Sequence, residues 1–537
     1  MSGELKEESW VDEWSKDFIV RRSLEEDFSI QRHSFYSHSP LRQFVQVVFT
    51  GFVKPSYYMK ANEVYGVSRE LHMMVAGKEP EFHLKTIQIG RDEGLLKDQP
   101  LIGLLARLKP TLNLRDYFDS HVELLSTYPP NIIFKKFLLP VKRREFGYGL
   151  GRHVKRLLQG VFSIWDDSRK LRYYVVRYRS VIKKTLKFVH YPINKDYARY
   201  LFGKELSSIT DEYLRASVKF RELVKMKRYK DACNVAEEYN LPFELIRSSI
   251  PASYYDKSDV YSAILRTITP LGLLMFGVPL AKSGVPVDEI CKSLERKIPK
   301  SNVTSFEVAR PMFVSYKYEG GIGSLTNKFG ELYASRIANV WDRINTSFLR
   351  LSDSNIGLIL DASGSMRPER LFGEFTRSLI ALAPLGKRVK RLVLFSERAI
   401  EVDSKLLCSL EGLLELKNVG VGISSGTNIV SGLDLMMEYV NSGEVDTVIL
   451  STDEQANINE FSYTEADIIK RMIRKGCRVV IHNPTPYPVH ISNPIDGVTY
   501  IYGDRADSVI GSLRVQALRD LRDEEVKRLI LEVSFAK

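Results

Sequence analysis

A short polar loop after an apolar run carries the clearest chemistry in this chain of 537 residues. The run from Ile356 to Leu360 has the length and composition of a buried strand in a parallel sheet. Asp361 then falls at the carboxyl end of that strand, with Ser363 and Ser365 in the loop that follows. One carboxylate and two hydroxyls around a tight loop are hard oxygen ligands, the kind that Mg²⁺ prefers.

Two later segments supply further ligands of the same kind. Thr427 lies just before an apolar-periodic segment that begins at Ile429, and Asp453 ends a second apolar strand. Because open α/β sheets place their ligands at the carboxyl ends of their strands, we expect these residues to meet at one edge. The predicted ligands of a divalent metal, Mg²⁺ by preference, are Asp361, Ser363, Ser365, Thr427 and Asp453.

This set of five resembles the metal-ion-dependent adhesion site of von Willebrand factor A domains. The resemblance extends from about 355 to 537, where strand-like and helix-like segments alternate as in an α/β doubly wound sheet. It implies one coordination position that RNA, a protein or neither completes, and the sequence leaves that choice open. A metal-free A domain with a decayed site is the alternative, which the five filled ligand positions disfavour.

Two enzymatic interpretations fit the same residues less well. Haloacid-dehalogenase enzymes carry Asp-x-Asp after the first strand, but the second position here is Ser363. The run from Gly422 to Gly426 fits the Gly-x-Ser-x-Gly elbow of hydrolases, and Asp453 and His482 follow in that family's order. The elbow requires a preceding buried strand, and 416–421 is too polar and glycine-rich to form one. We therefore expect no enzymatic activity.

The bulk composition is that of a globular protein of two to four domains, with 44% hydrophobic and 27% charged residues. No stretch approaches the roughly 18 apolar residues of a membrane span. The first residues lack a basic region followed by an apolar core, so we expect no signal peptide. The four cysteines are far apart and are expected to be thiols of a reducing compartment. These features together predict a cytoplasmic protein.

Positive charge is concentrated in one part of the chain. Residues 131–200 hold 18 Lys/Arg and 4 Asp/Glu, whereas the net charge of the whole chain is only +12. Such a block predicts binding to a polyanion, with nucleic acid first. Aromatic residues interleave with the charges, and we expect most of them to be helix core. The candidate RNA-binding residues are Lys142, Arg143, Arg144, Arg152, Lys155, Arg156, Arg177, Arg179, Lys183, Lys184, Lys187 and His190.

Helical periodicity dominates the chain from about 41 to 350, which suggests stacked HEAT-like repeats. Several landmarks in this region resemble the Ro ribonucleoprotein (TROVE) family, in the family's order. They are Tyr57-Tyr58 near the start, Gly149-Leu-Gly-Arg-His-Val-Lys-Arg156, Tyr174-Val-Val-Arg-Tyr-Arg179 with His190-Tyr-Pro192, and Ile268-Thr-Pro-Leu271. The predicted domains are an N-terminal extension (1–40), a TROVE-like helical-repeat domain (41–350) and the A domain (355–537) with its metal site.

The resemblance to Ro proteins implies a mainly α ring of repeats joined by the A domain. It implies a monomeric RNA-binding scaffold that holds small Y-like noncoding RNA on a basic outer face, and misfolded or single-stranded RNA ends in the ring, for RNA quality control. An exoribonuclease or another protein is the expected partner, and no membrane is involved. The spacing between Tyr178 and His190 departs from the family's pattern, which puts those contacts in doubt. The alternative is an A-domain adaptor that works with an AAA-type ATPase.

Overall fold

The computed structural model describes residues 39–50, 61–92, 99–113, 115–203, 206–301, 303, 305–316, 323–345, 354–370, 373–453, 465–484, 495, 497–502, 506–519 and 521–533. Nearly all of the predicted N-terminal extension and the Tyr57-Tyr58 landmark lie outside these residues. The chain forms two compact units. Unit 1 comprises 1–107, 304–306 and 333–537, and unit 2 comprises 108–303 and 307–332.

Unit 1 is built on a mixed sheet of six strands, in the order β3-β2-β1-β4-β5-β6. All neighbouring strands are parallel except β3, which runs antiparallel to β2 at the edge. The strands are β1 Ile356–Asp361, β2 Val389–Phe395, β3 Ala399–Val402, β4 Thr447–Ser451, β5 Arg478–Asn483 and β6 Val498–Tyr502. The helices that follow them are α22 Glu374–Leu382, α23 Leu410–Ile423, α24 Ile429–Asn441, α25 Glu465–Arg474, α26 Ala506–Ala517 and α27 Asp523–Leu531.

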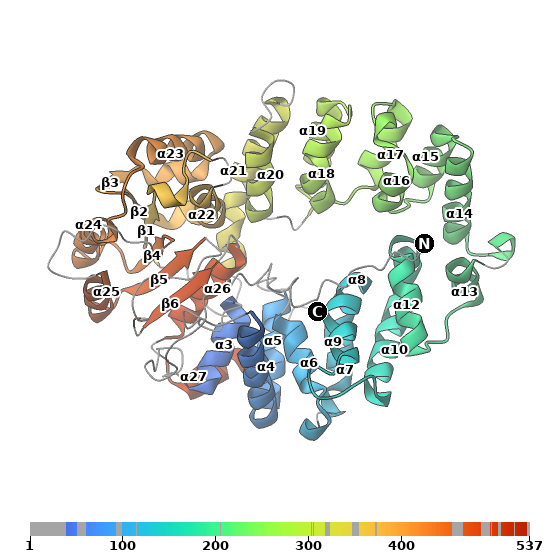
Figure 1. The fold of residues 1–537 in the computed structure, drawn as a ribbon, viewed down its shortest axis with the longest axis horizontal. Helices are drawn as coiled ribbons and strands as arrows, with labels where there is room; N and C mark the ends of the chain where they lie inside the picture. The colour runs from blue at the N-terminus through green and yellow to red at the C-terminus, as the bar shows by residue number, and fades with distance from the viewer. Residues whose placement is uncertain are drawn as a thin grey trace. The chain divides into compact units, whose positions relative to one another are not determined.

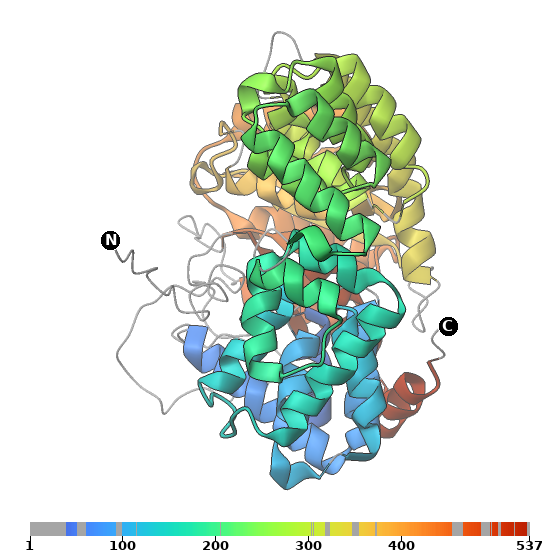
Figure 2. The same cartoon turned by 90° about the vertical axis from the view of Figure 1, so that its right-hand side faces the viewer.

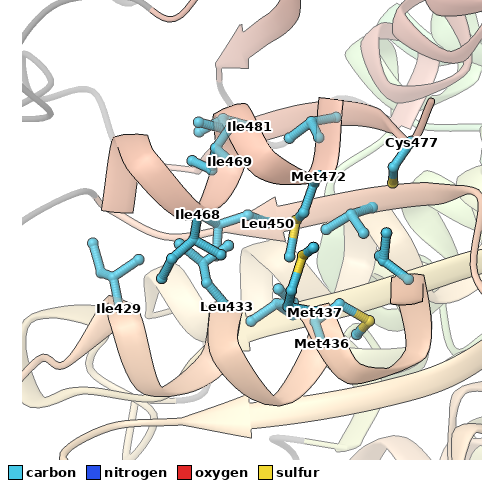
Figure 3. Packing of buried hydrophobic residues seen from close by; sticks show 14 of the residues in the cluster. Ile429, Leu433, Met436, Met437, Leu450, Ile468, Ile469, Met472, Cys477 and Ile481 are labelled. Atoms are coloured by element: carbon cyan, nitrogen blue, oxygen red, sulfur yellow. The ribbon is translucent and has the colours of Figure 1, made fainter. Parts of the chain in front are cut away.

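One face of this sheet packs against α24 and α25 through a continuous apolar core (Figure 3). Leu433 and Met436 of α24 and Met472 of α25 are fully buried there. Burial of each such side chain contributes about 1.5–3 kcal/mol of transfer free energy. Gly357 of β1 lets α24 approach, since a Cβ at this position would lie 2.4 Å from the sulfur of Met436. This face therefore holds β1 and β4, the two strands with the predicted carboxylates, in close register.

Helices from the start of the chain complete unit 1. They are α3 Pro40–Thr50, α4 Ala61–Lys78, α5 Pro80–Asp92 and α6 Gln99–Arg107. Helix α3 packs on α26, and α5 contacts α27 (Figure 1). The helices α3 and α26 come so close that a Cβ at Gly511 would overlap the carbonyl oxygen of Phe49. The Arg42 guanidinium pairs with Asp523 at 2.7 Å and also donates to the carbonyl of Arg519. The last helices of the chain thus pack against its first helices.

Unit 2 is helical throughout its described residues, and Figures 1 and 2 show α14 to α19 stacked as successive pairs. Its helices are α7 Phe118–Ser126, α8 Pro130–Ile132, the π-helical turn η3 Ile133–Leu138, α9 Leu139–Lys142, α10 Arg152–Asp167, α11 Lys170–Arg177, α12 Arg179–Val189, α13 Lys195–Phe202, α14 Glu212–Lys225, α15 Tyr229–Glu238, α16 Phe243–Ser249, α17 Ser258–Thr267, α18 Pro270–Lys282 and α19 Val287–Lys297. Two more helices, α20 Ser305–Tyr316 and α21 Gly323–Asn345, contribute to both units.

The expected class, helices followed by an α/β sheet domain, is confirmed, while the TROVE ring stays a prediction. The sheet also contains the short edge strand β3, which carries no apolar run that would have predicted it. Within the described residues, no helix is long and apolar enough to cross a membrane.

Candidate metal centre and basic surface

Three loops at one edge of the sheet of unit 1 bring the predicted metal ligands together. Strands β1 and β4 are parallel neighbours with Leu360 opposite Ser451, so Asp361 and Asp453 both follow the same end of the sheet. The chain adds β2 on one side of β1 and β4 on the other, which makes this the switch point of the topology. Ligands bind at such points in open α/β sheets.

The loop after β1 is ordered by its own hydrogen bonds. The amide of Ser363 donates to the Asp361 carboxylate at 2.9 Å, and the hydroxyls of Ser363 and Ser365 lie 3.1 Å apart. The amide of Gly364 donates to the carbonyl of Ser425 at 3.0 Å, which ties this loop to the one that carries Thr427. Asp361, Ser363, Thr427 and Asp453 are all buried, and Ser365 is half-exposed.

Two residues that the sequence analysis missed hold these loops in place. The Thr452 hydroxyl donates to the second oxygen of Asp361 at 2.6 Å, which joins the loop after β4 to the loop after β1. The Ser396 hydroxyl donates to the carbonyl of Gly426 at 2.8 Å and accepts from the amide of Ser425. Ser396 and Thr452 directly follow β2 and β4. These positions in the sequence could have identified them, because residues at the strand ends on this edge lie next to the site.

The electrostatics of the site favour a bound cation. Burial, and to a lesser extent the negative charge of Asp453, raise the pKa of Asp361 to about 7. Two buried carboxylates without a cation repel each other, so a divalent ion would relieve both effects. The described residues contain no cluster of three or more His, Cys, Asp or Glu side chains that could hold a metal. A metal at this edge would therefore depend on the hydroxyls as well as the carboxylates, and the residues present fit Mg²⁺.

The hydrolase elbow finds no support in the local fold. Residues 416–421 belong to α23, so no strand precedes Ser424. The His482 side chain is buried, and its Nδ1 lies 2.8 Å from the Ser451 hydroxyl. Ser451 in turn donates to the Ser378 hydroxyl at 2.8 Å, so His482 belongs to a buried chain of hydrogen bonds.

Unit 2 carries the predicted basic residues, and most of them stand free of acidic partners. The α12 helix contacts α8, η3 and α10, which brings several basic segments side by side. The ammonium of Lys142 lies 5.2 Å from the ring centre of Phe188, and that of Lys184 lies 5.9 Å from the ring centre of Phe134. We define the basic surface by the residues that are exposed or half-exposed and make no ion pair within the described part of the chain: Lys142, Arg143, Arg144, Arg152, Lys155, Arg156, Lys183, Lys184 and Lys187.

Two of the other three predicted RNA-binding residues, Arg177 and Arg179, are engaged within the protein. Arg177 pairs with Glu244 and donates to the hydroxyl of Tyr173. Arg179 donates to the carbonyl of Tyr200 at 2.9 Å, where it caps the end of α13. The backbone of His190 has a left-handed φ of 55° and terminates α12, while its side chain is exposed. Arg177 and Arg179 therefore have structural partners that the basic surface lacks.

Of the interleaved aromatic residues, Trp165 is core, whereas Tyr173, Tyr174, Tyr178 and Phe188 are half-buried, so the expectation that most of them are core is not met. Trp165 is buried and its indole NH donates to the carbonyl of Ser126 at 2.9 Å. It packs edge-on against Phe162 and Tyr174 with ring centres 5.4 and 5.0 Å away. Tyr173, Tyr174 and Tyr178 are half-buried beside it.

Comparison with known families identifies the sheet domain. The family model described as VWA domain containing CoxE-like protein matches residues 335–490. These residues are therefore a VWA domain of the CoxE-like type, in agreement with the fold and with the ligand positions. No curated protein matches the chain. The comparisons give no evidence for a TROVE domain, so the Ro resemblance of the helical region stays a prediction.

Proposed function

We propose that the protein is a non-catalytic scaffold that binds structured RNA through the basic surface of unit 2. The observation that carries this proposal is the set of nine exposed or half-exposed cations on α9, the turn after it, α10 and α12, which have no acidic partners within the described residues. Uncompensated cations repel one another and lower stability, so a polyanionic ligand would relieve a cost that the fold otherwise carries.

Contacts of this kind bind phosphates rather than bases. Arg152, Lys155 and Arg156 lie at i, i+3 and i+4 of α10, on one side of the helix. The opposite side of α10 is buried through residues such as Val154 and Leu158. Phosphate contacts give affinity and steep salt dependence without sequence recognition. By its resemblance to Ro proteins, the ligand is a Y-like small noncoding RNA, with misfolded or single-stranded RNA ends as a second class of ligand.

The A domain is proposed to hold Mg²⁺ with Asp361, Ser363, Ser365, Thr427 and Asp453. A bound metal would supply a Lewis-acidic coordination site for an oxygen ligand of a partner. The residues of the chain itself orient that site: Thr452 holds the Asp361 carboxylate, and Ser396 holds the loop of Thr427. The partner, an exoribonuclease or another protein, would dock there without chemistry on the bound RNA.

Filter binding of a structured RNA tests the proposal. The double variant Arg152→Glu with Lys155→Glu should weaken binding by at least about tenfold at low salt, because two phosphate contacts become repulsive. The matched control is Lys219→Glu with Arg296→Glu, which reverses one lysine and one arginine that are exposed on α14 and α19. Equal affinities of the two double variants would refute the assignment of this surface.

An A-domain adaptor that works with an AAA-type ATPase is the second candidate, and the CoxE-like match favours it. This function requires the metal site but gives no role to the basic surface. Two results together would establish the adaptor in place of the RNA scaffold. Association with such an ATPase would require Mg²⁺ and Asp361, and RNA affinity would be the same in the wild type and in the charge-reversal variant of the basic surface.

A further inference from the structure

Three successive turns of the helical stack line up along one edge of unit 2, and we call them the turn edge. They join α14 to α15 (226–228), α16 to α17 (250–257) and α18 to α19 (283–286). The rings of Tyr229 and Tyr254 are 4.5 Å apart, and Lys230 reaches Asp259 at 3.6 Å. A Cβ at Gly284 would lie 3.0 Å from the Cβ of Asp256. The turn edge is thus continuous across three helix pairs.

The turn edge exposes apolar and aromatic surface. Met226 is 65% exposed and Tyr254 is 39% exposed. The backbone of Tyr254 is fixed on both sides. Its amide donates to the carbonyl of Pro251. The next residue, Tyr255, is buried, and its hydroxyl donates to the carbonyl of Arg247. The ring of Tyr229 supports Tyr254 from one side. An aromatic ring held in this way offers a stacking platform at little entropic cost.

The turn edge also carries several basic side chains. Lys225 and Lys227 are exposed and make no ion pair within the described residues. Arg228, Lys230 and Lys257 pair with nearby carboxylates, at distances between 2.7 and 3.6 Å. Each of these three pairs is neutral overall, so Lys225 and Lys227 carry the uncompensated positive charge of the turn edge. The basic surface differs, because Phe134 and Phe188 there lie under lysine ammonium groups.

We propose that the turn edge binds a single-stranded segment of RNA, with an unpaired base stacked on Tyr254 and the adjoining phosphates on Lys225 and Lys227. This proposal rests on the proposed RNA-binding function and adds a second contact to it. Base stacking on an exposed aromatic residue is tolerant of sequence. It selects for unpaired nucleotides, because the bases of a duplex already stack on one another. The basic surface would then bind duplex RNA, and the turn edge would bind single-stranded RNA.

Binding of the full chain to a short oligouridine strand, compared with an RNA duplex of the same length, tests this division. Tyr254→Ala should weaken binding of the single strand by about tenfold, the effect of removing one stacked base, and leave binding of the duplex unchanged. Tyr254→Phe keeps the aromatic face and should retain affinity. Tyr316→Ala is the control, because Tyr316 is a similarly exposed tyrosine (38%) on α20. The pair Lys225→Gln and Lys227→Gln should lower the salt slope of single-strand binding by about 1.4.

The outcomes separate the two proposals. If Tyr254→Ala changes single-strand affinity by less than about twofold, or weakens strand and duplex equally, the turn edge is not a stacking site. If the duplex still binds through the basic surface in that case, only the turn edge is refuted. If neither RNA binds the wild-type chain, both proposals fail.

Discussion

The metal centre of unit 1 and the basic surface of unit 2 are built in opposite ways. At the metal centre, the loops after β1, β4 and α23 converge, and four of the five ligands are buried. Hydrogen bonds hold the Asp361 carboxylate and the loop that carries Thr427 in place. On the basic surface, side chains from separate helices stand in solvent with no acidic partner within the described residues. One region is organised before a ligand arrives, and the other supplies charge without fixed geometry.

This difference predicts different responses to conditions. A buried site that needs deprotonated carboxylates should depend on pH and metal concentration but weakly on salt. A surface of lysines and arginines should depend steeply on salt and little on pH near neutrality. If the two regions are independent in this sense, a substitution in one should leave the other unchanged.

Substitution of Asp361 by Asn should give the largest change, confined to the metal centre. It removes one of the two carboxylates and with it most of the attraction for Mg²⁺. At a concentration about a hundredfold above Kd, bound Mg²⁺ stabilises a protein by about 2.7 kcal/mol, and the variant should lack this increment. Urea unfolding with and without Mg²⁺ measures it.

The control for this substitution is Glu415→Gln, an exposed carboxylate on α23 of the same unit. It should leave the Mg²⁺ increment as in the wild type. Persistence of the increment in the Asp361→Asn variant would contradict the ligand assignment. A loss of RNA affinity in that variant would show that the two regions are coupled.

Arg179→Ala should act on stability rather than on RNA. The substitution removes the charged hydrogen bond to the carbonyl of Tyr200, so we expect a loss of about 2 kcal/mol in the free energy of unfolding. Arg152→Ala, at an exposed position, should change stability by less than about 0.5 kcal/mol. Denaturant unfolding of both variants measures this contrast. If Arg179→Ala is as stable as Arg152→Ala, the capping role of Arg179 is wrong.

Mg²⁺ affinity should fall by about tenfold between pH 8 and pH 6, while RNA affinity stays nearly constant. The raised pKa of Asp361, about 7 in the metal-free fold, means that protons compete with the metal in this range. In the metal-free protein the folded state keeps a proton that the unfolded chain releases, so stability should fall as pH rises from 3.8 to about 7. Calorimetric titration with Mg²⁺ at several pH values measures the first effect. A flat affinity would indicate that Asp361 is already ionised in the metal-free fold.

The metal centre was predictable from the sequence because both of its carboxylates lie at strand ends, where an apolar run fixes their position. The apolar runs before Asp361 and Asp453 predicted two buried strands, and both are confirmed as β1 and β4. The role of Ser396 was not predicted, because it depends on the order of the strands. Strand β2 lies next to β1, and this places the Ser396 hydroxyl at the loop of Thr427.

The basic residues were harder to sort because charge alone does not reveal partners. Arg177 lies among other basic residues in the sequence, yet its partner Glu244 comes 67 residues later. The packing of α3 on α26 joins the two ends of unit 1 and left no local signal either. Such pairings depend on long-range topology, which periodicity and composition do not encode.

The salt dependence of RNA binding shows whether the basic surface contacts phosphates. The slope of log affinity against log salt reports the number of phosphates that the protein neutralises, at about 0.9 per contact on a duplex. We predict that Arg152→Glu with Lys155→Glu lowers this slope by about 2, with EDTA present, and that Lys219→Glu with Arg296→Glu leaves it unchanged. A wild-type slope near zero, or equal slopes for the two double variants, would contradict RNA binding by the basic surface.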